Sequence, residues 1–103
     1  MIEYCNVNKL TPILTIGSFL KEITESDIDA LHRKIGANVM QVRKEKGLTQ
    51  LDLALSIGLK SVGLISVAEI YHNKKHFNIE HLYKIATALE VEITDFFKDI
   101  HTK

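Results

Sequence analysis

The stretch Gly47-Leu48-Thr49-Gln50-Leu51-Asp52-Leu53-Ala54-Leu55-Ser56-Ile57-Gly58 decides the fold of this chain. Thr49 suits an N-cap because its hydroxyl can accept a hydrogen bond from a free amide of a first helical turn, and Asp52 has capping-box spacing. Gly47 and Gly58 suit the left-handed residue that follows a helix C-terminus. The stretch therefore predicts a short helix over 50–57 with further helices before and after it, which is a helix-turn-helix pattern.

Apolar residues on both sides of this stretch recur at three- and four-residue intervals, which indicates amphipathic helices. Thr24 and Asp27 have capping-box spacing and predict a helix over 24–46. Further along, caps start three more helices, and the predicted starts are Ser61 for a helix over 62–70, Asn78 for a helix over 79–89, and Thr94 for a short last helix. We therefore predict an all-α fold with five helices.

The N-terminal region has a different pattern. Residues 10–16 contain several β-branched side chains around Pro12, which would confine any strand to the edge of a sheet. We expect a short strand or extended arm there. The predicted organisation is an N-terminal extension over 1–23, a candidate dimerisation arm, followed by one domain over 24–103.

The composition limits the class of protein. The chain has 103 residues, of which 46% are hydrophobic, and this is enough for one compact core. No apolar run approaches the roughly 20 residues of a membrane span, and the N-terminus lacks the pattern of a secretory signal. The single cysteine, Cys5, cannot form an internal disulfide, which fits a reducing compartment. We expect a cytoplasmic protein with no membrane association.

The charge of the chain is unevenly distributed. The formal net charge is zero, but residues 35–75 carry six basic and three acidic residues, a net charge of +3. Residues 1–34 and 76–103 have net charges of −1 and −2. The positive excess therefore falls on the predicted helix-turn-helix, where contacts with DNA phosphates need it.

The order and spacing of residues 35–97 resemble the Cro/phage-repressor type of helix-turn-helix domain, known as the XRE family. The residues that carry the resemblance are Arg43, Gly47-Leu48-Thr49-Gln50, Leu53-Ala54, Ile57-Gly58-Leu59, Ile65-Ser66, Glu69, Leu82, Ile85-Ala86, Leu89, Val91 and Phe96. The resemblance implies a λ-repressor-like fold in which the second helix lies across the DNA backbone and the third enters the major groove.

This resemblance also implies site residues. Gln50 matches a position that commonly holds a phosphate, although a helix former on a solvated face is the alternative. The full set of implied phosphate contacts is Arg43, Thr49, Gln50, Lys60, Lys74 and Lys75, and the positions implied for reading bases are Ser61, Val62, Gly63, Ser66 and Val67. Base readout normally uses Arg, Asn or Gln, whereas here only Ser66 offers a hydrogen bond. We therefore expect phosphate contacts and DNA shape to provide much of the binding.

Leu51 and Leu55 depart from the family pattern, which usually places polar residues there. The two leucines are four residues apart and share one face of the second helix. Two interpretations remain open: they are covered by apolar residues of the N-terminal segment, or they form a possible interface with another subunit or a protein partner.

Other chemistry finds little support in the sequence. His72, His76 and His81 are close together, but no second cluster has metal-ligand spacing with them, so we expect no metal and no cofactor. The motifs of nucleophile elbows, phosphate loops and zinc proteases are absent, so we expect no enzyme activity.

The sequence therefore favours a DNA-binding transcriptional regulator that acts as a repressor by occupying an operator, as a homodimer on double-stranded DNA. The alternative is a helix-turn-helix antitoxin or protein-interaction adaptor with weak or no specific DNA binding.

Overall fold

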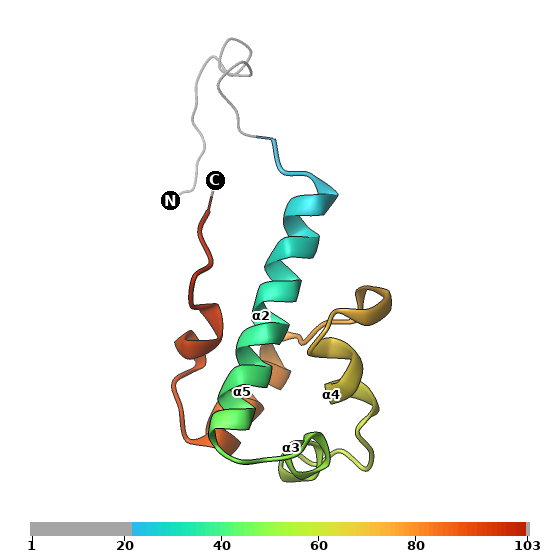
Figure 1. Cartoon of the computed structure of the whole chain (residues 1–103), viewed down its shortest axis with the longest axis vertical. Helices are drawn as coiled ribbons and strands as arrows, with labels where there is room; N and C mark the ends of the chain where they lie inside the picture. Colours follow the sequence, from blue (N-terminus) through green and yellow to red (C-terminus); the bar gives the residue numbers. More distant parts are fainter. Residues whose placement is uncertain (1–21, 103) are drawn as a thin grey trace.

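The computed structural model describes residues 22–102, and this part of the chain is all-helical with no strand. Figure 1 shows the long α2 standing beside the shorter helices, with the C-terminal segment running back along it. The elements are the α-helices α2 (Glu25–Glu45), α3 (Gln50–Ser56), α4 (Gly63–Ala68) and α5 (Ile79–Leu89), and the 3-10 helices η2 (His72–Lys74) and η3 (Ile93–Phe97). The strand predicted over 10–16 lies outside the described residues.

Three of the predicted helix starts are confirmed by their hydrogen bonds. Thr24 with Asp27 and Thr49 with Asp52 form reciprocal capping boxes at the starts of α2 and α3. Gly47 and Gly58 have φ values of 76° and 89°, the left-handed backbone that ends α2 and α3. The helix starts and ends that the sequence predicts for α2 and α3 are therefore present.

Asn78 starts α5 with an unusual capping box. Its side chain accepts from the His81 amide at 2.7 Å, and the Asn78 amide donates to His81 Nδ1 at 3.1 Å. A ring nitrogen accepts a hydrogen bond only when it carries no proton. Burial lowers the pKa of His81, which favours the neutral ring that this cap requires.

Two predicted elements differ from the structure. The third helix is shorter than 62–70 and begins at Gly63, because Ser61 is not its N-cap: Val62 takes that position in helical conformation, and the Ser61 hydroxyl accepts only a long hydrogen bond of 3.4 Å from the Gly63 amide. The predicted fifth helix is the 3-10 helix η3, which follows Glu92 and has no side-chain cap from Thr94. The described residues thus form four α-helices.

The core lies between α2, α5 and η3, with α3 and α4 closing one end (Figure 1). Its fully buried side chains include Val39, Leu53, Ile65, Ile85 and Phe96. A buried polar contact fixes the C-terminal segment, because the Asn38 amide donates to the carbonyl oxygens of Phe96 at 2.9 Å and Lys98 at 3.0 Å. No described helix is long and apolar enough to span a membrane.

A close backbone contact sets the position of α4 against α2. A Cβ atom on Gly36 would lie 2.4 Å from the carbonyl oxygen of Ala68 and 2.7 Å from that of Glu69. Backbone atoms cannot yield as a flexible side chain does, so this crossing requires glycine. The end of α4 therefore lies directly on the middle of α2.

A buried ion pair joins the three helices around this crossing. Arg43 of α2 donates to the Glu69 carboxylate through Nε at 2.7 Å and Nη2 at 3.0 Å, and through Nη1 to the carbonyl oxygen of Leu48 at 2.7 Å. Gln50 of α3 donates to the same carboxylate at 2.9 Å. Glu69 follows α4 directly, so one buried carboxylate ties α2, α3 and α4 together.

We expect Gly36→Ala to lower the free energy of unfolding by roughly 1–3 kcal/mol, because the added methyl group must push α4 away from α2. Gly63→Ala is the matched control. Its added Cβ atom meets nothing closer than Ser61 Oγ at 3.7 Å, and alanine stabilises a helix by up to about 1 kcal/mol relative to glycine. Urea denaturation measures both variants. Equal stabilities of Gly36→Ala and the parent protein would contradict the close contact.

We expect Glu69→Ala to lower the free energy of unfolding by roughly 3–5 kcal/mol, because it leaves the Arg43 guanidinium buried without its counter-charge. The control Lys84→Ala removes an exposed pair with Glu80 and should leave denaturant midpoints unchanged. A loss for Glu69→Ala no larger than for Lys84→Ala would show that the buried pair does not hold the helices.

Candidate nucleic-acid interface

The helix-turn-helix unit consists of α3, the turn over 57–62 and α4, at the end of the molecule where α2 finishes (Figure 1). The unit is anchored from within: Leu53 and Ala54 of α3 and Ile65 and Ala68 of α4 are buried in the core. The opposite faces of both helices remain accessible to a partner.

The residues that we predict to read bases are together on the turn and the accessible side of α4. Ser61 and Gly63 are exposed, and Val62, Ser66 and Val67 are half-buried. The Ser66 hydroxyl donates to the Gly63 carbonyl oxygen at 3.0 Å, so its own oxygen can still accept a hydrogen bond. This surface has a small polar content and two accessible valine side chains.

Of the residues predicted to contact phosphate, Thr49 and Gln50 lie at the start of α3, and Lys60 lies on the turn before α4. Lys60 is exposed on the turn, and Thr49 is exposed at the start of α3. Gln50 is half-buried and held by Glu69, which fixes the orientation of its amide group.

Arg43 has a different environment from the one that we predict. It is only 6% exposed, and three of its nitrogen atoms donate within the protein. A guanidinium in this position neutralises Glu69 and cannot reach a phosphate without breaking the ion pair, so we leave Arg43 out of the DNA contacts that we propose.

Lys74 and Lys75 lie on the loop between α4 and α5, and their surroundings differ. The Lys74 ammonium contacts Glu25 at 2.7 Å and Asp29 at 3.3 Å, and the hydrogen bond with Glu25 is the main cause that raises its pKa. Its charge is therefore compensated by α2. Lys75 is exposed and, within residues 22–102, no ion pair of its ammonium is seen.

The same loop is fastened to α2 by aromatic rings. Tyr71, in left-handed conformation, donates its hydroxyl to Asp29 at 2.8 Å, and this hydrogen bond lowers the pKa of Asp29 and raises that of Tyr71. His32 of α2 stacks on His76 with ring centroids 3.8 Å apart. These contacts involve residues for which the sequence gives no local pattern.

Leu51 and Leu55 are 46% and 56% exposed on α3. No described residue buries them, so the interpretation as a contact surface is still available. The other interpretation, in which the N-terminal segment covers them, concerns residues 1–21, which lie outside the described residues.

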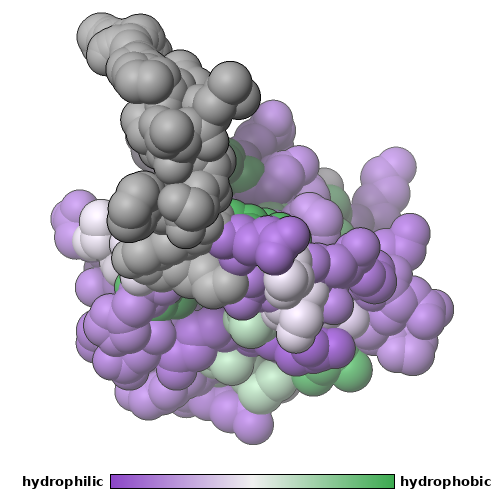
Figure 2. All heavy atoms as spheres, turned by 90° about the horizontal axis from the view of Figure 1, so that it is seen from above, coloured by the Kyte–Doolittle hydropathy of each residue, from purple (hydrophilic) through white to green (hydrophobic). Residues whose placement is uncertain are grey.

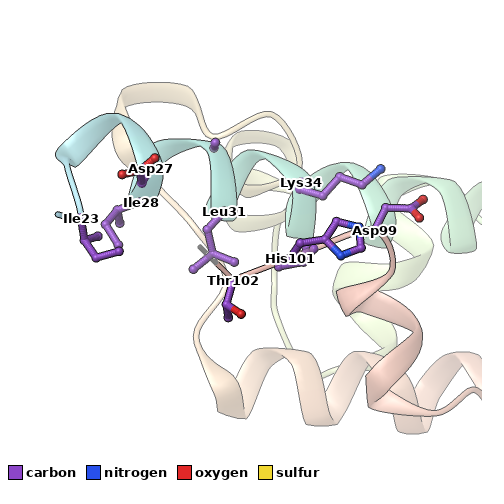
Figure 3. A pocket seen from close by; sticks show the side chains of 10 residues that line it. Ile23, Asp27, Ile28, Leu31, Lys34, Asp99, His101 and Thr102 are labelled. Atoms are coloured by element: carbon purple, nitrogen blue, oxygen red, sulfur yellow. The ribbon is translucent and has the colours of Figure 1, made fainter. Parts of the chain in front are cut away.

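A groove of about 420 Å³ lies at the far end of α2 from α3 and α4 (Figure 3). Ile23, Ile28 and Leu31 line one side, and the segment 99–102 lines the other. Ile23 and Ile28 are 58% and 41% exposed, so apolar surface continues along α2 beyond the core. Viewed from this end, the described surface is mostly hydrophilic, with smaller apolar areas (Figure 2). Because its lining comes from residues 23–34 and 99–102, the groove is separate from the helix-turn-helix surface.

The three histidines singled out in the sequence do not converge. His76 stacks on His32, His81 caps α5, and His72 lies exposed in η2. Across residues 22–102, no group of three or more His, Cys, Asp or Glu side chains is placed to hold a metal ion.

Sequence reasoning assigned no role to three residues that position the interface. They are Gly36 in α2, Glu69 directly after α4 and Tyr71 at the start of the loop between α4 and α5. A buried acid at the end of an apolar helix is a signal that a basic partner is needed. The identity of that partner, 26 residues earlier in the chain, has no local signature.

The comparison with known families agrees with this geometry. The family model for the HTH_3 helix-turn-helix domain matches residues 39–96, from the second half of α2 to η3, which is more than half of the chain. No curated protein matches the sequence. The match spans the whole unit of α3, turn and α4 and the buried Arg43–Glu69 pair that supports it. The chain therefore belongs to the Cro/C1-type (XRE) helix-turn-helix family of DNA-binding regulators.

Proposed function

We propose that this protein is a transcriptional repressor that acts by occupying an operator in double-stranded DNA. The observation that carries the proposal is the accessible face of α4, which is held against α2 and α3 by the Arg43–Glu69–Gln50 contacts in a chain of this family. In helix-turn-helix proteins such a second helix enters the major groove, and the preceding helix crosses the backbone.

The proposed phosphate contacts come from Thr49, Gln50, Lys60 and Lys75. Lys60 lies on the turn before α4 and Lys75 on the loop after it, and both are exposed, so their ammonium groups can contact a DNA backbone on either side of α4. Phosphate contacts fix the orientation of a protein on DNA without selecting a sequence.

The proposed base contacts come from Ser61, Val62, Gly63, Ser66 and Val67. Serine can bond to more than one base, and valine can pack on a thymine methyl group. Because this set lacks side chains with forked donors, we propose that sequence-dependent DNA shape supplies part of the specificity.

We propose further that the protein binds as a homodimer, with residues 1–23 and the N-terminal half of α2 as the dimerisation element. The exposed Ile23 and Ile28 and the groove beside them support this assignment. Two half-sites would then lie about 34 Å apart, which is one turn of DNA.

Selection of bound sequences from a random duplex library tests the function. We expect an enriched site with two-fold symmetry for the parent protein. Ser66→Ala should relax the preference at one base pair in each half-site, with a discrimination loss of roughly 1–3 kcal/mol at most. The absence of any enriched sequence would reject operator occupancy and leave Leu51 and Leu55 as the surface to examine for a protein partner.

Lys60→Ala should weaken binding to all duplexes and reduce the salt dependence of the affinity, because one phosphate contact is lost. The slope of log K against log salt concentration is expected to fall by about 0.9. Lys98→Ala, which removes an exposed lysine after η3, is the control and should keep the parent slope. If Lys60→Ala changed the preferred sequence and kept the slope, Lys60 would contact bases.

A further inference from the structure

The loop between α4 and α5 is an irregular segment held on α2 by side chains. It contains three residues in left-handed conformation, Tyr71, Asn73 and Lys74, with φ values of 58°, 52° and 61°. Such conformations are unfavourable for residues other than glycine and persist when surrounding contacts impose them. The contacts with α2 therefore determine the path of this loop.

The centre of these contacts is a stack of rings. His32 of α2 stacks with two rings of the loop. The His76 ring lies on it with an interplanar angle of 18°, and the Tyr71 ring has its centroid 5.6 Å from that of His32. His76 Nδ1 is 3.1 Å from the carbonyl oxygen of Lys74. A carbonyl oxygen only accepts, so Nδ1 carries the hydrogen.

Charged groups surround the stack on both elements. From α2, Asp29 accepts from Tyr71, Arg33 lies over the Tyr71 ring at 5.3 Å, and Glu25 pairs with Lys74. From the loop, Lys74 also contacts Asp29. Asp29, whose charge acts to raise the pKa of His32, is thus already shared between Tyr71 and Lys74, which limits its ability to compensate new positive charge.

Protonation changes the interaction between the two histidines. Neutral imidazole rings attract when stacked, whereas two imidazolium rings at a centroid distance of 3.8 Å repel each other. Burial lowers the pKa of His32, and the nearby His76 lowers it further, while Asp29 acts in the opposite direction. A folded-state pKa below the ordinary value means that the stack is stable above about pH 6.5 and loses stability as the pH falls through that value and below it.

We propose that the stacked His32 and His76 form a pH-sensitive clamp that holds the α4–α5 loop on α2 and thereby positions Lys75 beside the DNA backbone. Acidification opens the clamp because a protonated His32 ring places a positive charge in a stack whose nearby carboxylate, Asp29, is already paired. The role of Lys75 rests on the DNA binding proposed above, whereas the opening of the clamp does not. His32 and His76 are positioning residues and do not contact the nucleic acid in this proposal.

Amide hydrogen exchange of the full chain tests the clamp without DNA. The amides of Lys74 and Lys75 donate to the carbonyl oxygens of Tyr71 and His72, so they report on the loop. Their protection factors should fall in the parent protein between pH 7.5 and pH 5.5. His76→Phe keeps an aromatic ring without a titrating group and should abolish most of this fall.

His72→Phe is the matched control, because His72 is an exposed histidine of the same loop outside the stack. The protection factors of the Lys74 and Lys75 amides should fall in His72→Phe as they do in the parent protein. This variant also keeps His81 at the start of α5 and therefore its acid sensitivity. A loss of amide protection in His76→Phe equal to that in His72→Phe would contradict the proposed clamp. NMR titration of the His32 ring is a second readout: its pKa should rise in His76→Phe, and an unchanged pKa would also reject the coupling.

DNA affinity at the same two pH values separates the clamp from the function. For the duplex enriched by selection, acidification should weaken the parent protein relative to His76→Phe by about tenfold, the magnitude of one hydrogen bond to a charged group. If the loop amides lose protection but both proteins keep the same relative affinity, the clamp stands and the placement of Lys75 on DNA is rejected. Failure of both proteins to bind any duplex would instead reject the proposed function.

Discussion

The arrangement of the helix-turn-helix depends on the buried ion pair between Arg43 and Glu69. Burying either charge alone is unfavourable, so each residue requires the other, and the geometry of the pair is bidentate. Because Arg43 also donates to the Leu48 carbonyl oxygen and Gln50 donates to Glu69, the pair fixes the end of α2, the start of α3 and the end of α4 at one point. A short helix such as α4, with six residues, has little stability of its own and takes its orientation from this point.

The local signals of the sequence predicted the helix starts well. Thr24 with Asp27 and Thr49 with Asp52 are four-residue patterns whose hydrogen bonds close within one turn, so they form without contacts from distant parts of the chain. Gly47 and Gly58 act in the same way, because their backbone conformation is unfavourable for other residues. Ser61 is not the cap because Val62 takes the N-cap position in helical conformation.

The parts that sequence reasoning did not predict depend on long-range contacts. The resemblance implies a phosphate contact for Arg43, yet its side chain is buried and pairs with a carboxylate 26 residues later. It implies the same for Lys74, whose two acidic partners lie on α2, 45 and 49 residues earlier. The candidate base-reading residues all lie within 61–67, on α4 or directly before it, so the position of this one helix brings them together.

The glycine at the crossing of α2 and α4 has a mechanical consequence. Where two backbones are in direct contact, there is no layer of side chains that could change rotamer and let one helix tilt over the other. α4 therefore meets its partner as a rigid body whose angle is set before contact. In the DNA complex proposed above, any adjustment between a half-site and this protein would be made by the duplex, through bending or a change of groove width. The cost of that deformation differs between sequences, so a stiff protein surface converts the elasticity of DNA into selectivity.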